Sequence, residues 1–563
     1  MAAAMFGAVS GDELDRHLRG IAREVRLSGT PEEARAFDHI EAHLAGLGYT
    51  VSRFANESLV GYPGPASLEM LGDDAIVIHA NGYALSPPTP EAGITGPVLD
   101  VGDRLDGETP DLDARGALLL SDGLATPEKA LAAQRAGAIG HIHINDEQIH
   151  EMCISPVWGM PIPETAALLP SVPAVGISAA DGARLREAFS RGPVQVRLVT
   201  QPYRAWDPIP TLVADLPGRN KDQFVLFSGH VDSWHLGVMD NGTANATQLE
   251  VARLLAERRG ELCRGVRLAF WSGHSHGRYA GSAWYADAFW HDLHERCVCH
   301  VNVDSVGAIG ATVLEEAPAM AETYGFARTV LAETAGVDLT YTRISRSSDQ
   351  SFWGHGIPSL FGVLSQQPRD DSPTGAALAT LLGTGGRAGG LGWWWHTPED
   401  TLDKIDPANL RRDAGVYAEA MWRLCTIDRL PIDPAAAADE IAAALAHHQD
   451  QAGGAIDLSA TRTLATDLAA ALRAAPELDD EAANARAMAL CRLLIPVNYT
   501  RRGPFEQDLA TTSSALPGLS DAAQLSILDP TGDDARFLRN RLLRERNRIE
   551  HALRAATRRV EHG

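Results

Sequence analysis

The stretch FVLFSGHVDSWHLGVMDNGT, residues 224–243, decides the fold class of this chain of 563 residues. Residues 224–228 form a nearly unbroken apolar run, which is typical of a strand buried on both faces. A helical pattern follows at 244–259. Further strands are predicted at 265–271 and 297–303, and further helices at 282–294 and 320–335. This alternation predicts an α/β sheet, whose ligands gather at the carboxyl ends of its strands.

The rest of the chain differs in texture from this α/β part. Two amphipathic helices are predicted within 11–48, and residues 66–200 are short apolar runs separated by Gly, Pro and Asp, with one helix at 125–136. The tail is helical in pattern except at 500–517, a Pro/Gly-rich passage that we expect to be an extended crossing segment. We therefore predict an α/β domain from 1–65 and 201–430, a β-rich insert at 66–200 and a helical domain at 431–563.

Composition argues against several classes of partner. The formal net charge of -24 disfavours binding to nucleic acid or to an anionic membrane, which would need a basic surface. No stretch reaches the ~20 apolar residues of a membrane span, and the start has no leader pattern, so a cytoplasmic location is expected. Six scattered cysteines predict reduced thiols, and Cys297 and Cys299 are interpreted as buried strand residues in preference to half of a zinc clip.

Ligand-type side chains follow the predicted strands. His230 and Asp232 stand two apart at the end of one strand, so one can bind a metal while the other orients it. Asp240, in a Gly-flanked loop, is suited to bridge two metals, although a capped helix with a surface Asp would read the same. Asp304 follows the strand at 297–303, and His396 follows three Trp, where a packed core histidine is the alternative. Together, His230, Asp240, Asp304 and His396 predict a metal centre at one edge of the sheet.

The order of these motifs resembles the co-catalytic zinc aminopeptidase family, in the branch that holds glutamate carboxypeptidase and the transferrin receptor. The matching motifs are His230-x-Asp232, Asp240-Asn-Gly, Asp304-x-x-Gly307 and His396-Thr-Pro-x-Asp-Thr. The resemblance implies a mixed sheet flanked by helices, one or two zinc ions or other divalent metals, and a peptide or small-molecule amide substrate. It extends to the insert, which is similar to a protease-associated domain, and loosely to the tail, which is similar to a dimerisation domain and implies a homodimer.

One loop departs from the family pattern. The family has two adjacent glutamates here, the first a general base and the second a metal ligand, whereas this chain has Ser272-Gly-His-Ser-His276 after Trp271. Counting from Trp271 puts His274 in the base position, and counting back from Gly281-Ser282 puts His276 in the ligand position with Ser275 as base. Imidazole can bind zinc and can act as a base near neutral pH. We predict His274 as the general base and His276 as a metal ligand, with Asp232 as a second catalytic residue. The alternative is that His276 is the base and His274 the ligand.

Four further residues are candidates for contacting substrate. Arg346 and Asp349 stand in Ser348–Pro358 and its approach, which resemble the substrate-pocket segment of the family, although Arg346 could also be a surface-loop residue. Tyr279 and Arg278 flank the altered loop and could stabilise an oxyanion. Together these residues predict a metal-dependent hydrolase of an amide or peptide bond. The alternatives are a single-metal enzyme and, as the transferrin receptor illustrates, an inactive dimeric receptor or scaffold on the same fold.

Overall fold

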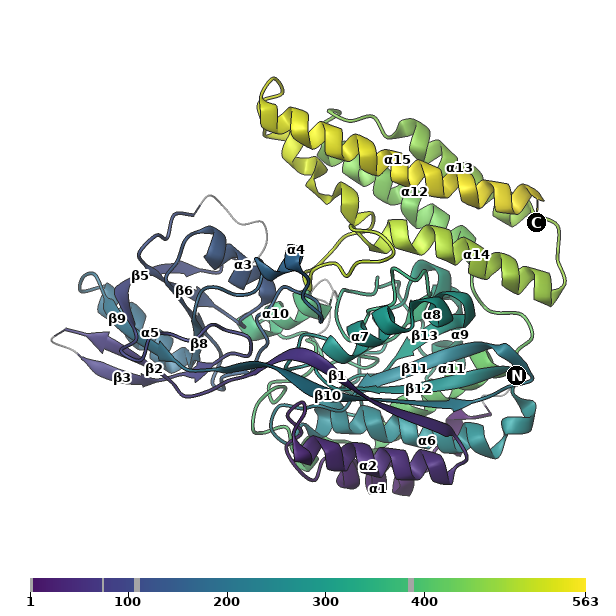
Figure 1. Cartoon of the computed structure of the whole chain (residues 1–563), viewed down its shortest axis with the longest axis horizontal. Helices are drawn as coiled ribbons and strands as arrows, with labels where there is room; N and C mark the ends of the chain where they lie inside the picture. The colour runs from purple at the N-terminus through teal and green to yellow at the C-terminus, as the bar shows by residue number, and fades with distance from the viewer. Residues whose placement is uncertain (1–3, 73–74, 106–111, 383–388, 563) are drawn as a thin grey trace.

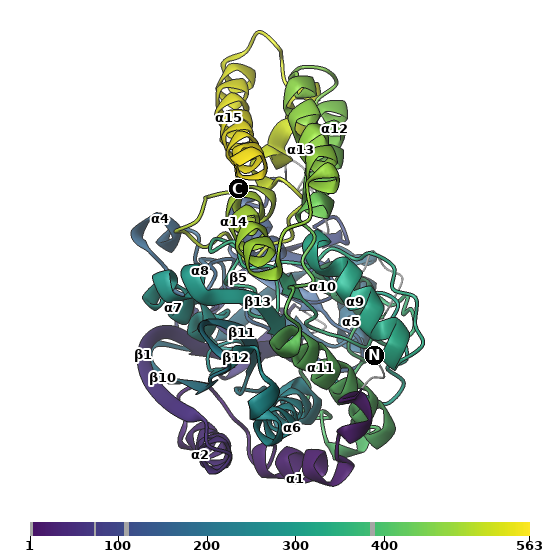
Figure 2. The same cartoon turned by 90° about the vertical axis from the view of Figure 1, so that its right-hand side faces the viewer.

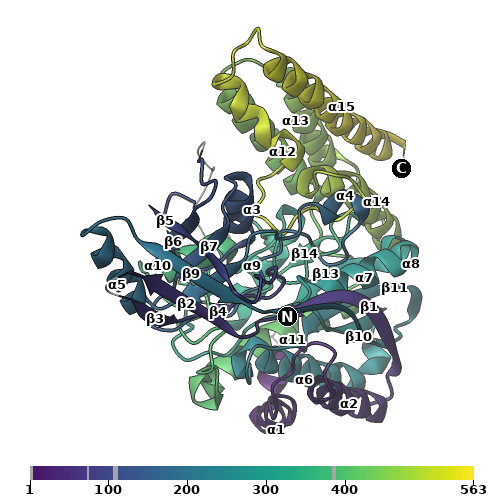
Figure 3. The ribbon, with the colours of Figure 1, turned by 60° about the vertical axis from the view of Figure 1, so that its left-hand side comes forward.

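The computed structural model describes residues 4–72, 75–105, 112–382 and 389–562. Two β-sheets and a bundle of helices make up the molecule (Figure 1). Figure 3 shows the smaller, β-rich part and the helical bundle on adjoining sides of the larger α/β part.

The larger part is built on a six-stranded mixed sheet with the order β1-β10-β12-β11-β13-β14. The first two neighbour pairs are antiparallel, and the strands from β12 to β14 run parallel. The α/β fold with a mixed sheet is thus confirmed, and the predicted strands at 224–228, 265–271 and 297–303 all lie in it. The bounds are β1 (Thr50–Tyr62), β10 (Tyr203–Leu216), β11 (Asn220–His230), β12 (Arg264–Trp271), β13 (Cys297–Asn302) and β14 (Ser359–Leu360).

Helices cover both faces of this sheet (Figure 2). α1 (Gly11–Ile21), α2 (Pro31–Gly46), α6 (Ala244–Glu257) and α11 (Pro407–Thr426) pack on one face, and α7 (Ala280–Ala288) and α8 (Trp290–Arg296) on the other. In α2, Phe37, Ile40 and Leu44 recur at helical spacing and are fully buried, each worth about 1.5–3 kcal/mol of burial. The predicted helix at 282–294 is in fact two helices, because Phe289 leaves helical geometry between α7 and α8.

The remaining elements of the α/β part are short or peripheral. They are η1 (Phe6–Ala8), η2 (Val238–Thr243), η3 (Arg259–Glu261), α9 (Ala321–Thr334), α10 (Pro373–Leu382) and η4 (Leu402–Lys404). Among them, η2 is part of the loop that leads from β11 into α6, and it contains Asp240.

Residues 66–200 form the second sheet, which has eight strands in the order β3-β2-β9-β5-β6-β7-β8-β4 and a separate hydrophobic core. The long strands β1 and β10 lead the chain into this sheet and out of it (Figure 1). Its elements are β2 (Ala66–Leu71), β3 (Ile76–His79), β4 (Asn81–Gly82), β5 (Ile94–Gly102), β6 (Leu118–Asp122), α3 (Pro127–Arg135), β7 (Gly140–Ile144), α4 (Pro163–Ala166), β8 (Ala174–Ile177), α5 (Ala179–Phe189) and β9 (Gln195–Thr200).

The tail is helical, with a core of its own made largely by Ala and Leu side chains. Its elements are α12 (Pro434–Gln451), α13 (Ser459–Ala474), α14 (Asp480–Tyr499), η5 (Pro517–Ser526) and α15 (Asp533–His562). Residues 500–516, here called the crossing segment, contain no helix or strand. This segment ties the three parts together, because Ala510 N donates to Pro156 O of the insert at 2.8 Å and Arg346 Nη2 of the α/β part donates to Gln507 Oε1 at 2.9 Å.

In the described part of the chain, none of the helices combines the length and the apolar character needed to cross a bilayer. The six cysteines are free thiols, and Cys297 and Cys299 are buried in β13, where burial raises the pKa of Cys297 to about 12. Their surroundings fit the interpretation as core strand residues.

Candidate metal centre

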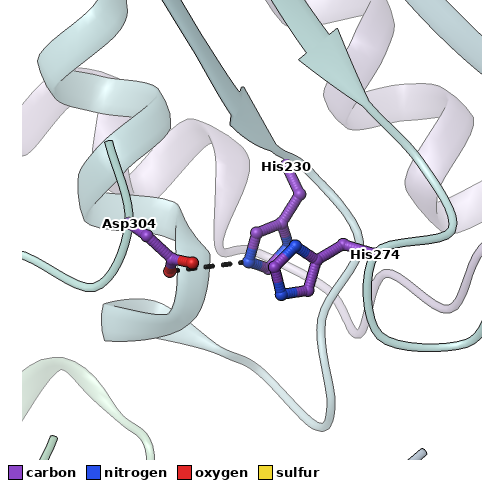
Figure 4. A group of neighbouring side chains, drawn as sticks. All are labelled: His230, His274 and Asp304. Atoms are coloured by element: carbon purple, nitrogen blue, oxygen red, sulfur yellow. Dashed lines mark ion pairs between the residues drawn. The ribbon is translucent and has the colours of Figure 1, made fainter. Parts of the chain in front are cut away.

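The carboxyl ends of β11 and β13 bring polar side chains together at one edge of the sheet. His230 is the last residue of β11, and Asp304 follows β13. Figure 4 shows their side chains beside that of His274, which comes from the loop after β12. Within the described residues, these three side chains are the group whose ligand atoms all lie within 4.8 Å of one another. The predicted convergence at a sheet edge is therefore what the backbone produces.

Asp240 lies between two imidazoles. Its Oδ1 is 3.0 Å from His230 Nε2, and its Oδ2 is 2.9 Å from His396 Nε2. Its main-chain amide donates to Asp400 Oδ2 at 3.0 Å, and the Met239 amide donates to Asp400 Oδ1 at 2.8 Å. Burial alone would raise the pKa of Asp240, but the two imidazoles hold it well below its ordinary value. Each carboxylate oxygen of Asp240 thus faces one histidine, as a bridging ligand would.

The donor set fits a divalent cation. His230 Nδ1 donates to Asp232 O at 2.8 Å, which turns Nε2 toward the carboxylates, where it is buried with no hydrogen-bond partner. Burial lowers the pKa of His230, but Asp232, Asp240 and Asp304 raise it well above its ordinary value. The three carboxylates therefore stabilise the positively charged, protonated form of His230. Imidazole nitrogens fixed by a hydrogen bond on the other ring atom, together with carboxylate oxygens, are the ligands that zinc takes in proteins.

His396 is fixed in the same way from the insert. Its Nδ1 donates to Glu151 O at 2.6 Å, and Glu151 N donates back to His396 O at 2.9 Å. Because Nδ1 carries the proton, Nε2 presents a lone pair toward Asp240. The insert thus supplies the main-chain contact that orients one histidine of the centre. His396 is buried, as the alternative of a packed core histidine implies, but its two ring nitrogens contact Glu151 and Asp240.

The two histidines of the altered loop lie in different surroundings. His274 stacks on His230 with ring centroids 3.7 Å apart and an interplanar angle of 15°. Its Nδ1 is 2.7 Å from Asp349 Oδ2, and Asp349 Oδ1 accepts from Ser282 Oγ at 2.7 Å. The buried Asp349 carboxylate therefore orients the His274 ring through Nδ1, and Nε2 takes no part in this contact.

His276 lies behind this group. Its Nδ1 is 2.9 Å from Ser28 Oγ and 3.3 Å from Asp232 Oδ2, and its ring packs against those of Tyr62 and Trp234. The structure brings His276 to Asp232, and it does not bring His276 together with His230, His274 and Asp304.

Asp232 contacts the loop more than it contacts His230. Its two carboxylate oxygens accept from Ser275 N at 2.8 Å and from His274 N at 3.2 Å. Its Oδ1 is 3.7 Å from His230 Nδ1, and the hydrogen bond to that nitrogen goes to the Asp232 main-chain oxygen. Asp232 thus anchors the main chain of the altered loop.

Three other predicted residues, Arg346, Arg278 and Tyr279, lie next to the crossing segment or the altered loop. Arg346 is buried and so is not a surface-loop residue; its Nη1 donates to Gln350 O at 2.6 Å. Arg278 Nη2 lies 3.5 Å from Ala510 O of the crossing segment. Tyr279 stands with its ring edge against His274, at a centroid distance of 4.7 Å. Both arginines therefore contact the crossing segment, and Tyr279 is the one of the three that touches the centre.

Sequence reasoning missed two residues of the centre. Asp400 holds the Asp240 loop through two main-chain amides, and Ser348 Oγ donates to Asp304 Oδ2 at 2.8 Å. Asp400 follows His396 in the motif His-Thr-Pro-Glu-Asp, which could have indicated it. Nothing in the local pattern distinguishes Ser348 from the neighbouring serines.

Comparison with known proteins shows what parts of this chain are similar to. Residues 211–421 match the model of peptidase family M28. A probable glutamate carboxypeptidase of Zea mays is 23% identical over 350 residues, which are 51% of this chain and 49% of that protein. Carboxypeptidase Q of Bos taurus is 27% identical over 275 residues, which are 46% of this chain and 57% of that protein. The chain thus spans about half the length of these curated relatives.

Solved structures show the same fold. A zinc aminopeptidase from Bacillus subtilis superposes with a TM-score of 0.54 at 22% identity, over 74% of this chain and 96% of that one. A peptidase M28 precursor from Shewanella amazonensis superposes with a TM-score of 0.57 at 20% identity, over 75% and 93% of the two chains. Residues 211–421 are thus matched to peptidase family M28, within a chain that shares the fold of zinc aminopeptidases.

Proposed function

We propose that this protein is a metal-dependent hydrolase that cleaves a peptide or amide bond in a small substrate. The observation that carries the proposal is the buried Nε2 of His230, which lies 3.0 Å from Asp240 Oδ1 and 3.6 Å from Asp304 Oδ1. A divalent metal, which we propose to be zinc, would be held there by these three residues and by His396. When bound, such an ion polarises a carbonyl group and lowers the pKa of water. The M28 match and the zinc aminopeptidase fold support this reading.

We assign His274 as the general base, because its ring is poorly placed to bind the metal that His230 binds. A metal lies close to the plane of an imidazole that coordinates it. The rings of His230 and His274 are nearly parallel, at 15°, with centroids 3.7 Å apart, so their planes meet only far beyond the roughly 2 Å of a zinc–nitrogen bond. His274 Nε2 can instead accept a proton from water beside the proposed metal position, while Asp349 accepts a hydrogen bond from the Nδ1–H group and stabilises the imidazolium that forms.

We further propose that one ion is held more tightly than a second. A second ion would have Asp240 and His396 as ligands from this set. The family takes its other ligand from the glutamate pair, and in this chain the altered loop has Ser275 and His276 there. His276 contacts Asp232 and Ser28 through Nδ1 and lies outside the group of His230, His274 and Asp304, so we propose that it is not a strong ligand of a second ion. The single-metal alternative is therefore the form that we expect at low metal concentration.

Metal content and turnover together test the proposal. Purified protein should contain zinc, and Asp240→Ala should lose both the metal and any cleavage of aminoacyl and peptidyl amide substrates. Glu399→Ala is a matched control, since Glu399 is an exposed carboxylate close in sequence to His396. A protein that binds no zinc, or one whose cleavage is unchanged after complete removal of metal by a chelator, would refute the proposal. Absence of metal would favour the inactive receptor or scaffold.

A further inference from the structure

Three histidines gather between α1 and α2, outside the candidate metal centre. His17 on α1 is buried, and His39 and His43 stand one turn apart on α2, half buried. His17 Nδ1 is 3.1 Å from His39 Nε2, and the ring centroids of His17 and His43 are 4.2 Å apart. Residues four apart on a helix share a face, so α2 presents two imidazoles to the third on α1.

The backbone of α1 leaves room for this cluster. A Cβ at Gly20 would lie 2.7 Å from His39 Cε1 and 3.0 Å from its Nε2. Any other residue at position 20 would therefore displace the His39 ring from His17. A glycine in a helix costs about 0.5–1 kcal/mol relative to alanine, so α1 is less stable here than it could be. In return, the imidazole of His39 packs directly against the α1 backbone.

The spacing of the nitrogens suits a metal. Two ligands at about 2.0–2.1 Å from a tetrahedral zinc are separated by roughly 3.3 Å, close to the 3.1 Å between His17 Nδ1 and His39 Nε2. His43 Nε2 is buried and has no hydrogen-bond partner. The ligand atoms of the three rings do not all lie within 4.8 Å of one another, so metal binding requires the half-buried ring of His43 to turn toward the pair. We propose that His17, His39 and His43 form a second site for a divalent transition metal, zinc above all, independent of the proposed hydrolase activity.

The charge state of the cluster favours binding. Burial, followed by neighbouring positive charge, lowers the pKa of all three histidines, that of His17 to about 2, so they are neutral at neutral pH. Arg16 Nη2 lies 3.0 Å from His17 Nε2 and can only donate, so the proton of His17 is on Nδ1. Metal binding would move that proton to Nε2. Glu13 Oε2, 3.7 Å from His17 Nε2, can then accept a hydrogen bond from Nε2–H once the exposed Arg16 side chain has turned away from both groups.

A metal here would join the two helices on either side of a functional loop. The α1–α2 connection carries Arg26, whose Nε donates to Val231 O and whose Nη1 donates to Leu236 O, both at 2.8 Å. It also carries Ser28, which contacts His276. Fixing α1 against α2 would hold both ends of this connection, and with it the segment that follows His230. We therefore expect a structural role, in which the bound metal holds α1, α2 and their connection in place next to the candidate metal centre.

Zinc binding to the full-length protein tests this site, with zinc ion alone as the added ligand. The double variant His39→Gln/His43→Gln should bind one zinc per chain fewer than the wild type and should lose part of the zinc-dependent rise in melting temperature. His447→Gln/His551→Gln, at two exposed histidines of the tail, is the matched control and should behave as the wild type. His396→Gln, at the candidate metal centre, should retain the zinc held by the cluster.

A second measurement does not depend on how well the variants fold. Zinc should protect His39 and His43 of the wild type from acylation by diethylpyrocarbonate, read residue by residue by mass spectrometry. Equal zinc content in the double variant and the wild type would overturn the proposal. Unchanged acylation of both histidines at saturating zinc would overturn it as well, whatever the hydrolase activity of the protein.

Discussion

Replacing Asp349 by asparagine tests the proposed base with little change in shape. The Asp349 carboxylate is 1% exposed, and its Oδ2 lies 2.7 Å from His274 Nδ1. A hydrogen bond to a charged group is worth about 1.5–3 kcal/mol. If that bond stabilises the imidazolium formed during proton transfer, its loss lowers kcat by roughly 10- to 150-fold, since 1.4 kcal/mol is about tenfold. The bound metal should stay in place, because Asp349 contacts none of the proposed ligands.

The two histidines of the altered loop provide the comparison. His274→Ala should lower kcat by about 10²–10⁴-fold, the usual contribution of a general base, and should retain the metal. His276→Asn preserves a nitrogen near the position of Nδ1 and should change kcat less than tenfold, roughly the loss of one neutral hydrogen bond. The expected order of turnover is thus wild type, His276→Asn, Asp349→Asn and His274→Ala.

The assay has two steps. Metal per chain is measured first by elemental analysis, and then kcat and KM are determined with aminoacyl p-nitroanilides and dipeptide amides at saturating zinc. If His274→Ala loses the metal, His274 is a ligand and the argument from parallel ring planes is refuted. If His276→Asn loses more activity than His274→Ala, the roles of the two histidines are exchanged.

Three further predictions concern stability. A Cβ on Gly281 would lie 2.4 Å from Ser272 O, so Gly281→Ala should cost about 1–3 kcal/mol in urea unfolding, whereas Gly325→Ala, with no atom within 4 Å of its Cβ, should add up to about 1 kcal/mol. Burial, and then Lys129, lower the pKa of His141 to about 3. The unfolded chain alone therefore takes up this proton below about pH 6.5, and stability falls by about 1.4 kcal/mol per pH unit from there to pH 3; His141→Gln should remove that loss in urea titrations at pH 7 and 4.5. Removing metal with a chelator should lower the melting temperature, and zinc should restore it, because bound ligand stabilises the folded state by about 4 kcal/mol at a thousand times its Kd.

The parts of the centre that lie on strands could be predicted from the sequence. The apolar run of β11 ends at His230 and that of β13 ends just before Asp304, and parallel strands bring their carboxyl ends to one edge. The α/β fold could be predicted from the alternation of strand and helix patterns, the insert from short apolar runs separated by Gly, Pro and Asp, and the tail from its helical pattern. Asp240 could be predicted because it is an acidic residue in a Gly-flanked loop that leads into a helix, α6.

The altered loop could not be predicted, because it is not extended. Alternation along a strand would have put His274 and His276 on the same side. Beyond Trp271 the chain instead turns, with φ of 75° at Gly273 and hydrogen bonds from Gly277 N and Ala280 N to Gly273 O. Side chains alternate in direction only along a strand, so beyond the end of β12 the side chains of His274 and His276 lie in different surroundings. The partner of His274 comes from the segment after α9, and no local pattern links residues so far apart in sequence.

The position of Asp349 bears on how such a centre could work without a glutamate in the loop. A neutral histidine in place of a carboxylate raises the net charge beside the metal by one, which would weaken cation binding. In this chain a buried carboxylate lies 2.7 Å behind the imidazole. Negative charge is thus present in the same direction from the metal, one side chain farther away. Because the interaction between charges falls with distance, this arrangement would attract a cation less than a directly coordinating carboxylate would. His274 would then accept a proton, in the position where counting from Trp271 puts the general base of the family.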